Sequence, residues 1–366
     1  MFRLMIAVSA LALVSACGDG DGQPFDFGDE TEEPAADDPT GTGGTGTGGD
    51  DTADQPDGVA GAELPPGTTE PQADGSIRRF EPRNEQGGGR IISPVVYDRE
   101  NDTFTVDNLA FDGFNTYQRG RAIGSMGGYA VYEADVQVTD FLDGDQVGQI
   151  VPYRAILGVS QNTVRNDAGE TVPRSSFAIV RTGGYVNFGF GGFVYEREGG
   201  VVLPTEGQAN FSGDYAGIRV FDARGGLEFV RGDMTVDIDF NDFNANAGVK
   251  GRIANREFFN ADGTPIATGN QEGQLPNPDV VFVITDGEGS SVDRNGEITG
   301  QVLSTYVPDG ANAPEEYETG TYFAVISGDL TDRADGGEIT GVMVITSTDP
   351  RDDVPAQETG GFILYR

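Results

Sequence analysis

The sequence predicts an all-β protein with a C-terminal eight-stranded antiparallel β-barrel, preceded by an N-terminal β-subdomain and a disordered acidic tether. Two observations support this prediction. Beyond residue 75, aromatic and β-branched residues occur in short runs separated by Gly, Asn and Asp. Within 232–240, apolar residues alternate with polar ones, which is typical of a strand with one apolar and one wet face. No long stretch has the periodicity of a helix.

Residues 1–16 have the features of a secretory signal peptide. Arg3 precedes an apolar run at 4–14, and the small residues Ser15 and Ala16 stand directly before Cys17. About eleven apolar residues extend roughly 16 Å as a helix, well short of the roughly 30 Å hydrocarbon core of a bilayer. The run is therefore a poor permanent transmembrane span.

Cys17 is the only cysteine, so it cannot form an intrachain disulfide. The sequence Val-Ser-Ala-Cys at 14–17 resembles a bacterial lipobox, which implies that the Cys17 thiol is acylated and the peptide cut before it. Two or more acyl chains hold a protein stably on a membrane. Gly18, directly after the cysteine, favours the outer membrane within this resemblance. The alternative is an ordinary signal peptide followed by a chance or buried thiol.

Residues 17–75 are predicted to form the tether. From 18 to 75 there are 16 acidic residues, no basic ones and 14 glycines, a composition that cannot bury a core. A flexible chain of this length has a root-mean-square reach of about 40 Å, and charge repulsion extends it further. It could hold a folded body off an anionic membrane.

Residues 76–204 are predicted to form the N-terminal β-subdomain, with a boundary near Leu203 and Pro204. Its expected strands are 90–97, 103–111, 129–139, 150–160, 176–181 and 185–197.

Residues 205–366 are predicted to form the barrel, because an even number of antiparallel strands can close into one. The eight expected strands are 207–221, 232–240, 247–254, 280–285, 297–304, 319–328, 338–346 and 360–365. The pentapeptide Gly-Glu-Ile-Thr-Gly occurs at 296–300 and 337–341, and glycine on the inner side of a strand allows bending and close approach.

The second face of these strands is predicted to be wet. It carries Asp237, Asp239, Lys250, Arg252, Glu297 and Glu338. An integral outer-membrane barrel needs a continuous apolar band on its exterior, so these charges argue against that alternative.

Segments 207–217, 232–240 and 249–253, together with 337–342 and 358–362, resemble the barrel domain of transferrin-binding protein B-like lipoproteins. The resemblance covers residues 205–366 and implies a surface protein whose variable loops contact a macromolecular ligand. Members include receptors for host iron-carrier proteins, haemoglobin or complement regulators. This chain has room for one barrel, about half of the two-lobed transferrin receptor, and none of its residues matches a known binding loop.

Composition excludes several classes of function. The net charge of −37 lacks the basic footprint that nucleic-acid binding needs. The absence of histidine excludes Ser-His-Asp and Cys-His catalysis and histidine-bound zinc. Carboxylate pairs could run glycoside hydrolysis, but no acid and nucleophile can be identified among 60 acidic residues. We therefore predict a protein that is not an enzyme and has no cofactor.

One candidate metal site follows from the sequence. Asp237, Asp239, Asn241 and Asp242 could give oxygen ligands to calcium where a strand ends. An outward strand face followed by an Asn/Asp-rich turn is the favoured interpretation of the same residues.

Two further segments allow a binding role. The aromatic run 185–195 could form a partner-binding strip, although aromatics beside glycines more often cover them within a sheet. Four arginines could touch anionic lipid, namely Arg78, Arg79, Arg83 and Arg90. Glu81 and Glu85 lie among them in the sequence and favour a solvated, partly paired surface instead.

The function predicted from the sequence is a lipid-anchored envelope protein that presents its barrel to a protein or other macromolecular ligand. One alternative is a structural envelope lipoprotein with no dedicated ligand. Another is a barrel that binds a small ligand or a metal carrier, and this function requires an internal cavity.

Overall fold

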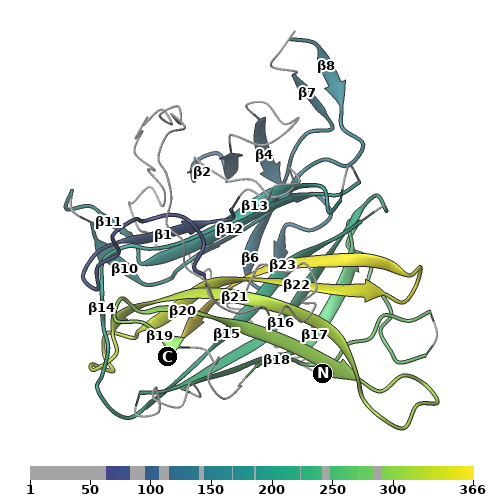
Figure 1. Ribbon diagram of the computed structural model, residues 1–366. Helices are drawn as coiled ribbons and strands as arrows, with labels where there is room; N and C mark the ends of the chain where they lie inside the picture. The colour runs from purple at the N-terminus through teal and green to yellow at the C-terminus, as the bar shows by residue number, and fades with distance from the viewer. Residues whose placement is uncertain are drawn as a thin grey trace, which may run out of the picture.

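The computed structural model contains strands and no helix in the residues that it describes (Figure 1). Those residues are 63–82, 95–106, 115–139, 144–166, 168–184, 187–222, 224–240, 248–271, 273–283 and 291–366. The signal segment, Cys17 and most of the predicted tether lie outside them. Over the described ranges, no helix is long and apolar enough to span a bilayer.

The C-terminal half closes into an eight-stranded antiparallel barrel, which confirms the predicted fold class. Each barrel strand pairs with the next, and β23 pairs with both β22 and β15 to complete the ring. The strands are β15 (Gln208–Phe221), β16 (Leu227–Asp239), β17 (Val249–Asn260), β18 (Val280–Phe282), β20 (Glu297–Tyr306), β21 (Glu315–Asp329), β22 (Glu338–Asp349) and β23 (Val354–Tyr365). Two short strands lie beside the ring, β14 (Val201–Val202) and β19 (Ser291–Val292).

Several barrel strands are longer than the sequence predicted. Strand β16 begins at Leu227 rather than 232, and β23 begins at Val354 rather than 360. The added residues carry buried charges that point inward, such as Glu228 and Glu358. A charge at an inward position interrupts the apolar alternation, which is why the pattern predicted a shorter strand.

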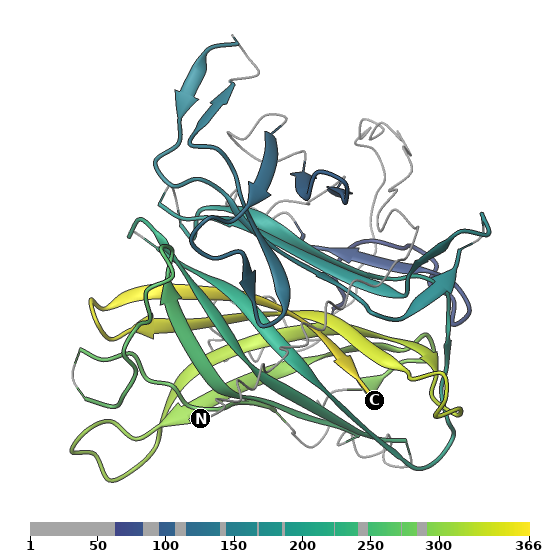
Figure 2. The same ribbon diagram turned by 180° about the vertical axis from the view of Figure 1, so that it is seen from behind.

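The N-terminal half forms a curled antiparallel sheet, a half-barrel that lies over one side of the barrel (Figures 1 and 2). Its strand order is β1 (Ile77–Phe80), β13 (Phe190–Arg197), β12 (Ser175–Thr182), β9 (Arg154–Val159), β6 (Tyr129–Glu133), β4 (Asn115–Arg119), β3 (Thr103–Val106) and β2 (Val95–Asp98), with β5 (Ser125–Met126) beside β6. Two ribbons stand apart from this sheet, β7 (Gln137–Thr139) with β8 (Gln146–Gly148) and β10 (Thr163–Arg165) with β11 (Thr171–Pro173).

The sheet and the barrel share one apolar core. Phe177, Ile179 and Phe193 of the sheet belong to the same buried cluster as Phe323 and Ile363 of the barrel exterior. The rings of Phe193 and Phe323 stack with centroids 6.4 Å apart. A continuous core of this kind makes the two layers one packed body.

Glycine allows the layers to approach closely around Phe177. A Cβ atom added at Gly158 of β9 would lie 2.2 Å from the Phe177 ring, and one at Gly361 of β23 would lie 2.3 Å from it. The ring therefore occupies space that any other residue would need at these two positions. A Cβ atom added at Gly341, in the second copy of the pentapeptide, would likewise overlap the Phe323 carbonyl oxygen, as expected for an inward glycine.

The predicted wet exterior is wrong for two of its six charged residues. Glu297 is 2% exposed and Glu338 is fully buried, because the N-terminal sheet covers the side of the barrel on which they stand. Asp237, Lys250 and Arg252 are exposed as predicted, and Asp239 is half-buried. Alternation identified the outward face, but it contains no information about what covers that face.

Candidate functional site

The chain enters the folded body through a segment that we call the strap, residues 63–76. Its backbone lines up beside β1, with Thr68 N donating to the Arg78 carbonyl and Phe80 N donating to the Pro66 carbonyl, each at 3.0 Å. The prediction that the disordered tether extends to residue 75 is therefore wrong for 63–75. Apart from its prolines, this stretch has only Leu64 and Ala73 as apolar residues, and polar contacts with Arg79 and Arg197 hold much of it in place.

Arg197 fixes the second half of the strap. It is completely buried, and its guanidinium donates to the strap carbonyls of Gln72 and Gly75 at 3.1 and 2.8 Å. The same group donates to the barrel carbonyls of Asn295 and Ile326 at 2.7 and 2.8 Å. Burial lowers the pKa of Arg197 to about 10, so the group stays charged at neutral pH and forms strong hydrogen bonds.

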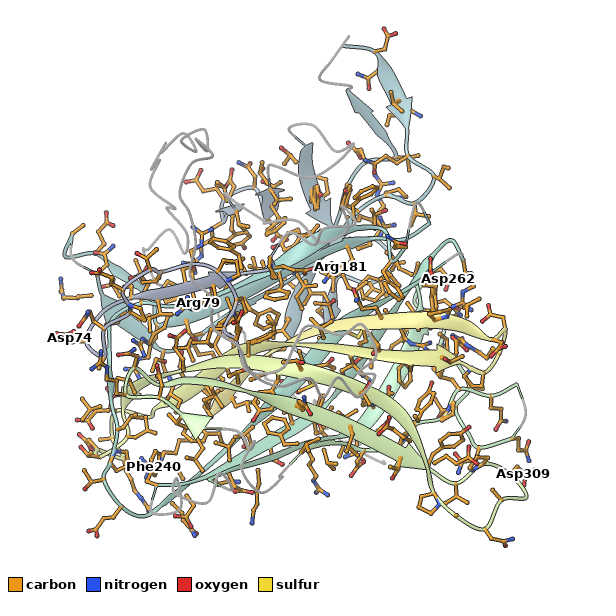
Figure 3. The ribbon with its side chains drawn as sticks, in the orientation of Figure 1. Asp74, Arg79, Arg181, Phe240, Asp262 and Asp309 are labelled. Atoms are coloured by element: carbon orange, nitrogen blue, oxygen red, sulfur yellow. The ribbon has the colours of Figure 1, made fainter. Side chains whose placement is uncertain are left out.

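Arg79 fixes the first half in the same way. Its guanidinium forms a bidentate pair with Glu297 of the barrel, at 2.7 and 2.8 Å, and also donates to the carbonyls of Pro65 and Thr68 at 3.2 Å. The hydrogen bond to Glu297 raises the pKa of Arg79. Figure 3 shows Arg79 between the sheet and the barrel, with Asp74 of the strap at the edge of the body.

Of the four arginines considered for lipid contact, the two that the structure describes do not form a solvated surface. Arg79 is 8% exposed and bound to Glu297, and Arg78 is half-buried beside Glu196, with the nearest charged atoms 3.9 Å apart. Arg83 and Arg90 lie outside the described residues.

The ribbon of β7 and β8 leaves the N-terminal sheet between β6 and β9, beside the pair of Glu133 and Arg154. It connects β6 to β9 where Arg154 pairs with Arg181. The last residues of the strap lie by Arg197 at the other ends of the strands, whereas its first residues run beside β1, with Pro66 bound to Phe80. Both views show it projecting beyond the sheet (Figures 1 and 2). The sequence predicted one strand over 129–139, but β6 ends at Glu133 and β7 begins at Gln137.

The ribbon is also where exposed aliphatic side chains gather. Val136 is 56% exposed, Val147 44% and Ile150 78%. Those residues flank or belong to the ribbon, and none of them is in a core cluster of the described chain. The Asp-rich run before Gly144 was a sequence signal for a turn here that the strand prediction missed.

The residues considered as calcium ligands do not form a ligand set where the structure describes them. The Asp237 carboxylate accepts a hydrogen bond from the Asn210 amide at 2.8 Å, and that of Asp239 accepts one from the Gln208 amide at 2.6 Å. Among the described residues, no group of three or more carboxylate, thiol or imidazole side chains could hold a metal. Asn241 and Asp242 lie outside the described chain.

These aspartates line an open hollow of about 700 Å³ at the end of the barrel near the C-terminus. Lys250, Arg333 and Arg366 bring cations to the same hollow. Opposite charges side by side give this surface no single ligand preference.

The aromatic run 185–195 packs rather than forming a strip in its described part. Phe193 and Tyr195 are at most 1% exposed and lie against the barrel. Tyr185 and Val186 lie outside the described residues.

Side chains of the described strands pack inside the barrel toward both of its ends. Apolar side chains fill one end, and the gap beside Val236, Phe282 and Tyr322 admits no water molecule. Charged side chains fill the other end, where Arg256 donates to Glu318 at 2.9 and 2.6 Å. A small-ligand barrel needs an internal cavity, and this packing does not favour that alternative.

No family model and no curated protein matches this chain. Among solved structures, it is similar to a crystal structure of a mutant of the vaccine antigen Transferrin Binding Protein B from Haemophilus parasuis Hp5, with a TM-score of 0.29 and 9% identity over 81% of this chain and 68% of that one. A double mutant of the same antigen gives a TM-score of 0.29 and 8% identity over 81% and 67%. At these values the family resemblance predicted from the sequence stays a prediction.

Proposed function

We propose that this chain is a lipid-anchored cell-envelope protein that presents a rigid, non-catalytic β body to a macromolecular ligand. The observation that carries the proposal is the projecting ribbon, where exposed aliphatic residues gather on an otherwise packed body. The strap is fixed to that body by Arg79 and Arg197.

The anchor in this proposal is the acylated Cys17 at the outer membrane. A tether with the composition of residues 18–62 contains no apolar run that could fold, so the body would stand some tens of ångströms from the lipid. Since the strap joins the body by several buried hydrogen bonds, the point at which the tether would join the body is fixed.

Fractionation of cells that express the full-length chain tests the anchor. Wild-type protein should appear in the membrane fraction with acyl groups on Cys17, and Cys17→Ser should release the body or leave an uncut precursor. Protease added to intact cells then distinguishes the outer surface from the periplasm. Unchanged and fully processed membrane association of Cys17→Ser would overturn the anchor.

The competing function is a structural lipoprotein without a dedicated ligand. Full-length protein on beads, incubated with envelope and environmental proteins, separates the two functions. A saturable partner supports the binding role, whereas retention that rises in proportion to concentration supports the structural one.

A further inference from the structure

Charged side chains of the described strands gather inside one end of the barrel. The register places Arg219 of β15 opposite both Glu228 of β16 and Glu358 of β23, so the three meet at one level. Six charged residues at this end are at most 6% exposed: Arg219, Glu228, Arg256, Glu318, Asp349 and Glu358. Charges this deeply buried must be compensated by partners, because water cannot solvate them.

An outer group of these charges is balanced. Arg219 donates from Nη1 to Glu228 and Asp349 at 3.0 and 2.9 Å, and Arg351 binds the same two carboxylates. The group consists of three arginines and three carboxylates: Arg219, Arg224, Arg351, Glu228, Asp349 and Asp352. With all six groups ionised, its net charge is zero.

An inner group has one arginine for two carboxyl groups. Arg256 donates to both oxygens of Glu318 at 2.9 and 2.6 Å, and the hydroxyl of Ser304 donates to Glu318 Oε2 at 2.6 Å. The same guanidinium reaches Glu358 only as a longer ion pair, with 3.7 Å between Nη1 and Glu358 Oε2. Arg256 is therefore engaged chiefly by Glu318.

Glu358 has few hydrogen-bond donors. Its Oε1 accepts from the hydroxyl of Tyr215 at 2.7 Å, and its Oε2 has no hydrogen-bond donor among the described protein groups. Burial raises the pKa of Glu358, against the opposing effect of Arg256. An ionised carboxylate that is 3% exposed and so little compensated is costly, whereas a neutral carboxyl needs much less compensation.

The surrounding strands supply no further cation to Glu358. The ionisable groups that face it are Tyr215 and Arg219 of β15, Arg256 of β17 and Glu318 of β21. Arg219 already serves two carboxylates of the outer group. Burial and the nearby Glu358 raise the pKa of Tyr215, so its hydroxyl stays a neutral donor. On β22 the residue opposite Glu358 is the apolar Ile345.

We propose that the folded barrel holds one proton at neutral pH, on the carboxyl group of Glu358. Arg256 and Glu318 then form a balanced pair, and the neutral carboxyl accepts from Tyr215 beside them. In the unfolded chain, where the pKa of this carboxyl is about 4.5, the proton is lost at neutral pH. The stability that the site contributes is therefore full below pH 4.5 and is lost as pH rises through the raised pKa of the folded state. The site depends neither on the anchor nor on a ligand.

Proton release on unfolding tests the proposal. The full-length protein in detergent is unfolded by urea at pH 7 in weakly buffered solution, and the released protons are titrated. Wild type should release about one proton more than Glu358→Gln, because the variant has no carboxyl there to ionise. The matched control is Glu257→Gln, whose side chain is 55% exposed beside Arg231 and which should release as many protons as wild type. Glu196 contributes equally in all three proteins.

Melting temperatures distinguish which carboxyl carries the proton. At pH 7, Glu358→Gln should melt close to the wild type, because an amide of similar shape replaces a neutral carboxyl. Glu318→Gln should melt at a lower temperature, because Arg256 loses its bidentate partner. From pH 6 to 9 the melting temperature of the wild type should fall relative to that of Glu358→Gln.

Glu318→Gln also provides a second measurement if Glu358→Gln does not fold. With Glu318 neutral, Arg256 can pair with Glu358, so Glu358 should ionise in the folded state and the extra proton should not be released. Unchanged proton release in either variant would overturn the proposal. A lower melting temperature for Glu358→Gln than for Glu318→Gln would place the proton on Glu318 and would also overturn it.

Discussion

Replacing Arg79 by methionine tests whether the strap and the barrel are joined by a buried ion pair. The side chains of Arg79 and Glu297 are 9% and 1% exposed. Arg79→Met keeps most of the apolar volume, but it leaves the Glu297 carboxylate buried without its two charge-assisted hydrogen bonds. Removing one partner of a buried pair lowers the free energy of unfolding by about 3–5 kcal/mol.

An exposed pair in the same chain provides the matched control. Arg231 and Glu257 also form a salt bridge, but their side chains are 50% and 55% exposed. Arg231→Met should lower the free energy of unfolding by at most about 1 kcal/mol, because water solvates the remaining carboxylate. The two substitutions therefore differ mainly in how deeply the ion pair that each one breaks is buried.

Urea denaturation of the two variants and of the double variant Arg79→Met with Glu297→Leu gives the comparison. The double variant should be more stable than Arg79→Met alone, because it removes the unpaired charge. Limited proteolysis should also cut the strap sooner in Arg79→Met, since the carbonyls of Pro65 and Thr68 lose their donor. Equal losses for Arg79→Met and Arg231→Met, or no recovery in the double variant, would refute the reasoning.

Three other properties can be checked with the same protein. Burial raises the pKa of the Glu196 carboxyl from 4.5 to about 7. The contribution of this group to the free energy of unfolding is therefore full below pH 4.5 and is lost, by about 3 kcal/mol, as the pH rises to 7. Glu196→Gln should flatten this part of the pH profile in urea titrations at pH 5 and 8, and an unchanged slope would contradict the assignment. Gly158→Ala places a methyl group against the Phe177 ring and should lower the free energy of unfolding by about 1–3 kcal/mol, whereas Gly75→Ala, with its nearest neighbour at 3.5 Å, should melt close to the wild type. Calcium should leave the melting temperature unchanged, and a rise that Asp237→Asn abolishes would revive the metal site.

The barrel could be predicted from sequence because its apolar end alternates regularly. Residues such as Met234, Val236 and Ile238 are buried at every second position, and each predicted barrel strand overlaps an observed one. The charged end was harder to predict, because Arg256 and Glu318 fill the interior as a pair. Neither residue type marks an inward position by itself, and the pairing joins positions 62 residues apart.

The contact between sheet and barrel could not be predicted, because it depends on which outward face the other layer covers. Glu297 and Glu338 have the same local pattern as exposed outward residues. Only their partners, Arg79 for the first and Ser160 and Ser175 for the second, show that they are buried. These partners come from the other half of the chain, so no local pattern could reveal them.

The position of these polar contacts also explains why the body has one arrangement. Apolar packing between Phe177, Phe193 and the barrel exterior is tolerant of small shifts, because dispersion contacts have little directional preference. The polar contacts around it are directional. Arg79 binds Glu297 near the strap, and Arg181 binds Glu81 and the hydroxyl of Thr359 farther along, as Figure 3 shows by the positions of Arg79 and Arg181.

A rotation or translation of the sheet on the barrel would break both of these contacts and leave several buried charges without partners, at several kcal/mol each. The apolar centre therefore supplies most of the attraction, and the surrounding ion pairs select the orientation. Because the strap and the ribbon both continue from the N-terminal sheet, fixing that sheet on the barrel also fixes where each of them begins.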